Sequence, residues 1–349
     1  MKTLKDVNVE NKRVLVRCDF NVPLDKKGNI LDDFRIRQTL PTIKYLIEEK
    51  AKIILMSHLG DPDGKVVPEL RLDKVAERLS EYLNFAVAKT NDCIGPEIES
   101  EANSLEFGGV LLLENLRFHK EETEPDSEFA KKLSYLGDIY VNDAFGVCHR
   151  NNASITLVPQ FLDHCAGLLL EKEIISLEKL LKNPEKPMVI IIGGKKVETK
   201  SKFINNISKS ADFVIVSGLI AKEIAEGVNG HPIKFEEPEK IIAPFGDLGA
   251  LDIDEDSIKM FCEKIMQAKT VLWNGPFGKF EERKYEKGTL AIAKAIIDSG
   301  AFSVVGGGET IEFLNKQGII QKFSHVSTGG GAMLNYLSGE KLPGLEYLN

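Results

Sequence analysis

Eight short runs of aliphatic and β-branched residues, separated by stretches with helical spacing, constrain the fold of this 349-residue chain most strongly. The predicted strands are residues 13–18, 52–57, 109–115, 138–143, 187–192, 212–217, 269–274 and 302–306. Their near-continuous hydrophobicity is typical of parallel strands that are buried on both faces. Helical patterns lie between them, as at residues 35–49, 71–83 and 288–299. Strands alternating with helices predict right-handed βαβ units and the α/β class, here as doubly wound, Rossmann-like sheets.

A helical segment divides these strands into two sets of four. In residues 167–187 the spacing of Leu168, Ile175 and Leu181 fits an amphipathic helix, and Asn183-Pro184 ends it. A chain of this length exceeds what one hydrophobic core usually holds. The sequence therefore predicts two α/β domains that are joined by a helix.

Composition excludes several classes of function. The net charge is −8, which argues against general binding to nucleic acid. The five cysteines are widely spaced and indicate neither a disulfide framework nor a zinc motif. The start of the chain lacks the apolar segment of a signal peptide, and no run is long enough to span a membrane. We expect a cytoplasmic protein without a nucleic-acid or membrane partner.

Basic residues of the first half lie at or just beyond predicted strand ends or at predicted helix starts. Ligands of open parallel sheets bind beyond the carboxyl ends of the strands. Arginine suits such a site because its guanidinium holds carboxylate and phosphate groups with two hydrogen bonds. Any one of these residues could be an ordinary surface charge, but together they predict a site for a small anion: Arg17, Arg35, Arg117, Arg150, His58 and His149.

Three glycine loops follow predicted strands of the second half and precede predicted helices. They are "GGKK" (193–196), "GGGET" (306–310) and "STGGGA" (327–332). Glycine lets the backbone approach a phosphate group, and the N–H groups at a helix start bind anions. Tight turns alone are the alternative reading of each loop. The segment "GDPDGKV" (60–66) misses the P-loop motif by one residue, and the dinucleotide fingerprint G-x-G-x-x-G does not occur.

Long motifs, in a fixed order over nearly the whole chain, resemble the phosphoglycerate kinase family. They are "RCDFNVPL" (17–24), "DDFRIRQTLPTI" (32–43), "SHLG" (57–60), "LLLENLRFH" (111–119), "YVNDAFGVCHR" (140–150), "IIGGKKVETK" (191–200), "VLWNGPFGKFE" (271–281), "GGGET" (306–310) and "HVSTGGGA" (325–332). The resemblance implies a glycolytic phosphotransferase that moves a phosphoryl group reversibly from 1,3-bisphosphoglycerate to Mg-ADP. It implies a 3-phosphoglycerate domain at residues 1–168, a linking helix at 169–186 and a nucleotide domain at 187–337, which close over the transferred group. We expect the tail, 338–349, to return to the first domain.

The resemblance also implies roles for individual residues. For 3-phosphoglycerate they are Asp19, Asn21, Arg35, His58, Arg117 and Arg150, with Arg17 and His149 in the same basic patch. For phosphoryl transfer they are Arg35, Lys196, Lys200 and Gly330. For the nucleotide they are Lys200, Glu281, Gly307, Gly308, Glu309 and Thr310, and Glu309 is the expected ligand of Mg²⁺.

Four departures from the family pattern leave two alternatives open. Asp61 stands where the family has an arginine, Leu219 where it has a glycine and Glu309 where it has an aspartate. The segment 227–252 is shorter than its family counterpart. The alternatives are a kinase for another small acyl phosphate or carboxylate, and a protein that binds the ligands with little catalysis. We expect a monomer.

Overall fold

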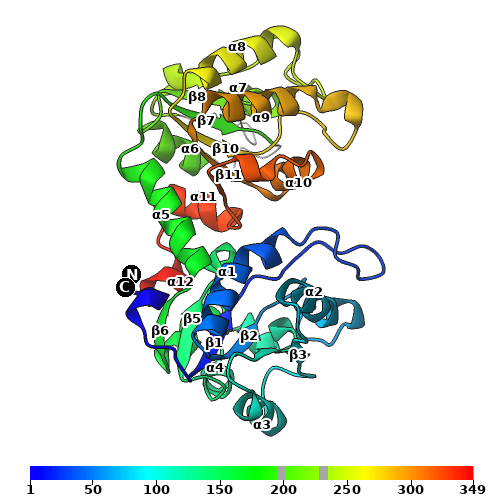
Figure 1. Cartoon of the computed structure of the whole chain (residues 1–349). Coiled ribbons are helices and arrows are strands. Elements are labelled where there is room, and N and C mark those ends of the chain that lie inside the picture. Colours follow the sequence, from blue (N-terminus) through cyan, green and yellow to red (C-terminus); the bar gives the residue numbers. More distant parts are fainter. Residues whose placement is uncertain (195–200, 228–234, 349) are drawn as a thin grey trace. The chain divides into compact units, whose positions relative to one another are not determined.

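Two six-stranded parallel sheets, each flanked by helices, form the framework of the chain in the computed structural model (Figure 1). The structure describes residues 1–194, 201–227 and 235–348. One unit comprises Met1–Lys172 together with Lys341–Asn349, and the other comprises Glu173–Glu340. Their boundary falls within helix α5, Leu168–Lys182. The predicted α/β class with two parallel sheets is confirmed.

The sheet of the first unit has the strand order β3-β4-β2-β1-β5-β6. Its strands are β1 Arg13–Arg17, β2 Lys52–Met56, β3 Ala88–Lys89, β4 Val110–Leu112, β5 Ile139–Asn142 and β6 Asp163–Ala166. Its helices, besides the start of α5, are α1 Phe34–Glu48, α2 Asp73–Leu83, α3 Pro96–Ser104, α4 Ser127–Ser134 and α12 Pro343–Glu346. All neighbouring strands are parallel, so their carboxyl ends share one edge.

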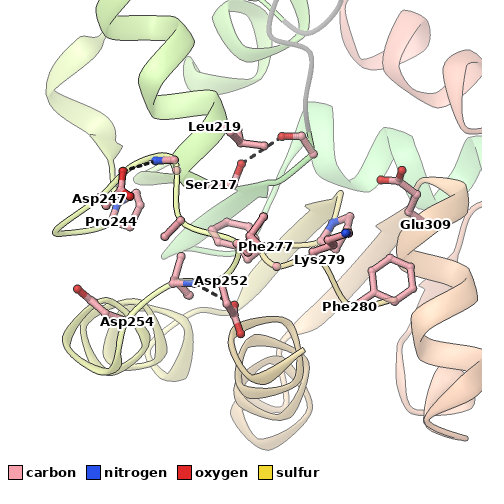
Figure 2. Close-up of a pocket in the computed structure, with 18 of the residues that line it drawn as sticks. Ser217, Leu219, Pro244, Asp247, Asp252, Asp254, Phe277, Lys279, Phe280 and Glu309 are labelled. Atoms are coloured by element: carbon pink, nitrogen blue, oxygen red, sulfur yellow. Dashed lines mark hydrogen bonds between the residues drawn. The ribbon is translucent and has the colours of Figure 1, made fainter. Parts of the chain in front are cut away.

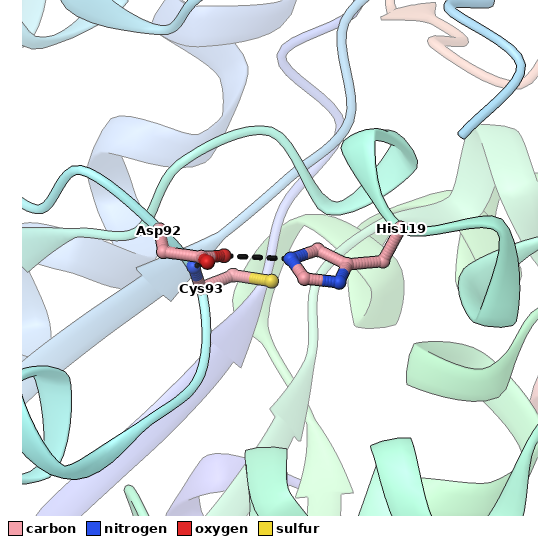
Figure 3. Close-up of side chains that lie close together, drawn as sticks. All are labelled: Asp92, Cys93 and His119. Carbon is pink, nitrogen blue, oxygen red and sulfur yellow. Dashed lines mark hydrogen bonds and ion pairs between the residues drawn. The ribbon is translucent and has the colours of Figure 1, made fainter. Parts of the chain in front are cut away.

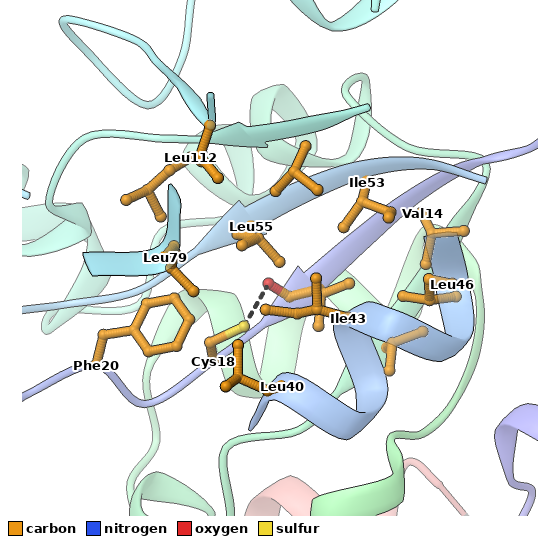
Figure 4. Packing of buried hydrophobic residues seen from close by; sticks show 14 of the residues in the cluster. Val14, Cys18, Phe20, Leu40, Ile43, Leu46, Ile53, Leu55, Leu79 and Leu112 are labelled. Atoms are coloured by element: carbon orange, nitrogen blue, oxygen red, sulfur yellow. Dashed lines mark hydrogen bonds between the residues drawn. The ribbon is translucent and has the colours of Figure 1, made fainter. Parts of the chain in front are cut away.

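Successive residues of the central strands supply two different cores. Val14 and Val16 of β1 belong to a cluster that also holds residues of α1 and α2, whereas Leu15 belongs to a cluster with residues of α3 and α4. Figure 4 shows Leu40 and Ile43 of α1 in the first of these clusters. Because side chains of a strand alternate between its faces, helices must cover both faces of this sheet.

The sheet of the second unit has the order β12-β11-β10-β7-β8-β9. Its strands are β7 Met188–Ile192, β8 Phe213–Val216, β9 Ile241–Ile242, β10 Thr270–Asn274, β11 Phe302–Gly306 and β12 His325–Val326. Its helices, besides α5, are α6 Ser201–Ser208, α7 Gly218–Glu226, α8 Glu255–Met266, α9 Lys287–Ser299, α10 Gly308–Lys316 and α11 Gly331–Leu337. Every residue of β7 and β10 is buried, which explains why these strands read as continuous apolar runs.

All eight predicted strands are present, and the helices predicted from residues 35–49, 71–83 and 288–299 correspond to α1, α2 and α9. The sequence did not predict β3, β6, β9 and β12, three of which have only two residues. In the described parts of the chain, no helix has both the length and the apolar composition needed to cross a bilayer.

Candidate functional site

The loop after β1 holds the side chain of Arg35 in a fixed position. Arg35 lies in the first turn of α1, and its Nη1 donates hydrogen bonds to Oδ1 of Asp19 at 3.0 Å and to the carbonyl oxygen of Asn21 at 3.1 Å. Asp19 is buried, whereas the side chain of Arg35 keeps 31% of its surface exposed. A buried carboxylate thus orients a guanidinium that is still accessible to a ligand.

The loops after β2 and β4 are tied to the same edge of the sheet. Asn21 accepts the N–H of Gly60 at 2.9 Å, and Nη1 of Arg117 donates to the carbonyl oxygen of Gly60 at 2.8 Å. Asn115 caps the single 3₁₀ turn Leu116–Phe118 by accepting the N–H of Arg117 at 3.1 Å. These bonds bring two of the predicted substrate residues, Asn21 and Arg117, to one loop.

A cavity of about 540 Å³ lies beside Arg117 and is also lined by Asp61, Asp63, Gly64, Thr123, Arg150, Asn151 and Asn152. Burial and the positive charge of Arg150 lower the pKa of Arg117, so the two guanidinium groups repel each other. An anion bound between the two guanidinium groups would offset this repulsion. Asp61 partly supplies that charge, with Oδ1 at 3.6 Å from Nη1 of Arg117, although its side chain is 83% exposed.

Arg17 and His58 lie deeper than the other basic residues. Nε of Arg17 donates to Oγ of Ser154 at 2.7 Å, and its Nη2 is 3.5 Å from Oε1 of the buried Glu122. Arg17 is therefore fully engaged by protein groups. His58 is buried, and burial followed by the charges of Arg17 and Arg117 holds its pKa well below the ordinary value, which makes it a neutral imidazole at pH 7.

His149 and Arg150 follow β5 in a loop at the same edge of the sheet. His149 is half-buried, and burial together with the charge of Arg150 lowers its pKa. Arg150 is exposed. The structure thus places all eight of the predicted substrate residues in the first unit and brings Arg117 and Arg150 to one cavity.

In the second unit, Gly193 of the first glycine loop packs closely against the backbone that follows β10. Gly193 donates its N–H to the carbonyl oxygen of Asn274 at 2.9 Å, and a side chain at Gly193 would overlap the carbonyl oxygen of Pro276. The ends of β7 and β10 therefore meet backbone to backbone. The predicted residues Lys196 and Lys200 lie outside the described residues.

A cavity of about 430 Å³ opens beside this loop (Figure 2). It is lined by Leu219, Phe245 and Leu251, residues that are 38%, 55% and 48% exposed. The predicted residues Glu281 and Glu309 line the same cavity and are exposed. Large apolar side chains rarely stay exposed together without a ligand or partner, so this arrangement suits a molecule with one flat apolar part and one polar part.

The segment from Pro244 to Asp254 forms a large part of the wall and was not predicted from the sequence. It packs on the start of α7 so closely that a side chain on Gly218 would lie 2.6 Å from the carbonyl oxygen of Leu248. Asp252 accepts the N–H of Gly288 at 3.1 Å, and burial raises the pKa of its carboxyl group. This contact joins the wall to the start of α9.

The other two glycine loops open helices α10 and α11. Gly307 and Gly330 have φ angles of +96° and +46°, a region that glycine adopts without strain. Gly308 and Glu309 are exposed in the first turn of α10, but Thr310 is buried, and its Oγ1 accepts the N–H of Gly275 at 2.9 Å. Thr310 therefore fixes the loop after β10 from inside.

Comparison with known proteins identifies the family. The family model described as "Phosphoglycerate kinase" matches residues 4–243 and 234–340. The chain belongs to the phosphoglycerate kinase family. It is 43% identical over 391 residues to the phosphoglycerate kinase of Aquifex aeolicus, covering 100% of this chain and 98% of that protein. It is 44% identical over 388 residues to that of Dictyoglomus turgidum, covering 99% of this chain and 97% of that protein.

Solved structures agree with this assignment. Phosphoglycerate kinase from Pyrococcus horikoshii has a TM-score of 0.89 at 34% identity and covers 100% of this chain and 98% of its own. The enzyme from Coxiella burnetii has a TM-score of 0.82 at 35% identity and covers 99% of this chain and 98% of its own. The family, the fold and the kinase function predicted from the sequence are confirmed, and neither alternative is favoured.

The comparisons also show a difference in length. The alignment with the Aquifex aeolicus protein is 391 residues long, so the relative has residues that this 349-residue chain lacks. The two family-model matches overlap at residues 234–243, which lie within the segment predicted to be short. The wall formed by residues 244–254 overlaps the end of that predicted segment, 227–252.

Proposed function

We propose that the protein binds 3-phosphoglycerate in the first unit and Mg-ATP or Mg-ADP in the second, and transfers a phosphoryl group reversibly between them. The observation that carries the proposal is the pair of guanidinium groups, Arg117 and Arg150, on one cavity of the first unit, which also contains the oriented Arg35. Family membership supplies the reaction, since ATP and ADP are the nucleotide substrates of phosphoglycerate kinases. The two domains are proposed as residues 1–168 and 187–337, linked by 169–186.

In the first unit the phosphate of 3-phosphoglycerate would lie between Arg117 and Arg150. The carboxyl group of 3-phosphoglycerate would face Arg35, Asn21 and the neutral His58. A neutral imidazole donates or accepts a hydrogen bond without adding charge, so attraction of the anion falls to the arginines. Arg17, held by Glu122 and Ser154, would act indirectly by keeping His58 neutral and in place.

In the second unit the nucleotide base would pack against Leu219 and Phe245, with the ribose near Glu281. Gly307, Gly308 and Thr310 would form the loop near the phosphates, together with Lys196 and Lys200. Mg²⁺ takes carboxylate oxygens and keeps several waters, and the exposed carboxylate of Glu309 on the cavity wall fits that preference. When bound, the ion would offset charge on the phosphate oxygens.

Phosphoryl transfer demands positioning and positive charge more than a protein base. The transferred group carries its charge on equatorial oxygens, and a guanidinium held by Asp19 can meet that charge without reorganising. We therefore propose Arg35 as the group that stabilises the transition state from the first unit, with Lys200, Lys196 and the N–H groups after Gly330 acting from the second. We further propose a cytoplasmic monomer.

The test is a coupled assay with purified protein, 3-phosphoglycerate and Mg-ATP, in which formation of 1,3-bisphosphoglycerate is followed through oxidation of NADH. Turnover should require the phosphate of the substrate, because Arg117 and Arg150 recognise it. D-glycerate, which has the same carboxyl group but no phosphate, is the matched control. Equal turnover with both substrates would refute the proposed role of the two arginines.

A further inference from the structure

Three side chains with different metal-binding atoms converge in the first unit, outside the cavity beside Arg117. Asp92 and Cys93 follow β3, and His119 lies between the single turns Leu116–Phe118 and Lys120–Glu122. Their donor atoms lie within 4.8 Å of one another, and Figure 3 shows the three side chains close together. Among residues 1–194, 201–227 and 235–348, this is the one such group of three or more possible ligands.

We propose that Asp92, Cys93 and His119 bind one zinc ion. Zinc is held by sulfur, nitrogen and oxygen ligands at about 2.0–2.3 Å in a tetrahedral arrangement, which places ligand atoms about 3.3–3.8 Å apart. The donor atoms lie within 4.8 Å of one another, and Nε2 of His119 and Oδ1 of Asp92, which are 2.6 Å apart, would have to move apart to reach these values. Three protein ligands leave a fourth position, which water can fill.

The ligands are already held by neighbouring groups. The His119 ring packs against Phe129 of α4 with centroids 5.3 Å apart, and the hydrogen bond between Nε2 of His119 and Oδ1 of Asp92, at 2.6 Å, would be replaced by bonds to zinc. The backbone N–H of Cys93 donates to the same carboxylate oxygen at 2.6 Å, and the hydroxyl of Thr90 donates to the carbonyl oxygen of Asp92. These contacts reduce the conformational freedom that the ligand side chains would lose when zinc binds.

Burial gives the site an inner and an outer side. Cys93 is fully buried, whereas the side chains of Asp92 and His119 are 53% and 26% exposed. Zinc would enter from the exposed side and form its bond to Sγ at the bottom. The thiol S–H bond breaks as the Zn–S bond forms, and its proton and any proton shared between His119 and Asp92 pass to solvent.

The surrounding charge favours a dication. The carboxylates of Asp92 and Glu121 face His119, and Glu122 acts on Cys93, whereas Lys132 is the cation that opposes them. Glu122 is also paired with Arg17, so its contribution is reduced. Removing the thiol should be the most damaging single change, because a thiolate is the strongest ligand of the set for zinc.

The experiment uses Co²⁺ as a spectroscopic substitute for Zn²⁺ and the full chain. Wild-type protein is expected to bind one equivalent with a near-ultraviolet thiolate-to-cobalt absorption band that Zn²⁺ abolishes. Cys93→Ser should lose the band and bind Zn²⁺ at least tenfold more weakly. Cys262→Ser, which changes a half-buried cysteine of the second unit, is the matched control and should behave as wild type.

A second measurement is needed because Cys93 is fully buried, so Cys93→Ser could lose zinc binding simply by failing to fold. Zn²⁺ should raise the melting temperature of wild-type protein, because it binds the folded chain, and should not do so for the variant His119→Asn, whose changed side chain is partly exposed in wild type. Absence of the cobalt band in wild type, its persistence in Cys93→Ser, or an equal Zn²⁺ shift in His119→Asn would each overturn the proposal.

Discussion

Asp61 is expected to weaken binding of 3-phosphoglycerate by competing for Arg117. Its carboxylate lies 3.6 Å from Nη1 of Arg117 on the cavity where the phosphate is proposed to bind, so the substrate must displace it. The side chain is 83% exposed, and exposed ion pairs contribute about 0.2–1 kcal/mol. Since 1.4 kcal/mol is about tenfold in an equilibrium constant, Asp61→Asn should lower the dissociation constant about 1.4- to 5-fold.

The assay is calorimetric titration with 3-phosphoglycerate in the absence of nucleotide. Asp63→Asn is the matched control, because it removes the same charge from an exposed residue of the same cavity. The difference between Asp61→Asn and wild type should shrink as salt is added, since charges in water are screened over about 8 Å at 0.15 M salt. An unchanged or larger dissociation constant, or an equal gain in Asp63→Asn, would refute direct competition.

Three further predictions concern other parts of the chain. Buried Glu173 accepts hydrogen bonds from Nε2 of His325 at 2.7 Å and the N–H of Thr328 at 2.6 Å, so Glu173→Ala should lower the free energy of unfolding, measured in urea, by about 1–3 kcal/mol per donor left unpaired. Phe245→Ala should weaken ADP binding about 2- to 10-fold in a titration, as expected for loss of one aromatic contact, and leave 3-phosphoglycerate binding unchanged. The third prediction concerns pH: the pKa of His58 in the folded chain lies below its unfolded value of about 6.5. The contribution of His58 to the free energy of unfolding is therefore complete above pH 6.5, and it is lost at lower pH because the unfolded chain takes up a proton there. Urea midpoints at pH 5 and 7 should therefore differ less in His58→Gln than in wild type, and an equal difference would contradict this.

The fold could be predicted from the sequence wherever burial alone sets the residue pattern. Strands β7 and β10 are buried at every position, so they appear as unbroken apolar runs. The two-residue strand β3 has one exposed and one half-buried residue, and pairing with β4 rather than its own composition makes it a strand. No local signal could identify it.

Some residues of the candidate site could likewise be predicted from the sequence, and others could not. Asn21 follows a predicted strand and Arg35 begins a predicted helix, so their position at the sheet edge follows from topology. Phe245 carries no such signal, because its place on the cavity depends on how residues 244–254 fold back onto α7. Arg17 meets Glu122, which is 105 residues away, and that separation hides the ion pair from any local pattern.

The proposed role of Arg35 in phosphoryl transfer is tested by comparing wild type and Arg35→Ala in the coupled assay, with the affinity for 3-phosphoglycerate measured on the same preparations. We predict turnover by wild type and a fall of about 10²–10³-fold in kcat for Arg35→Ala, with a much smaller change in affinity, because the guanidinium acts mainly on charge that develops during transfer. Near-normal kcat in Arg35→Ala would contradict its role, and absence of turnover in wild-type protein that binds both ligands would contradict the proposed kinase activity.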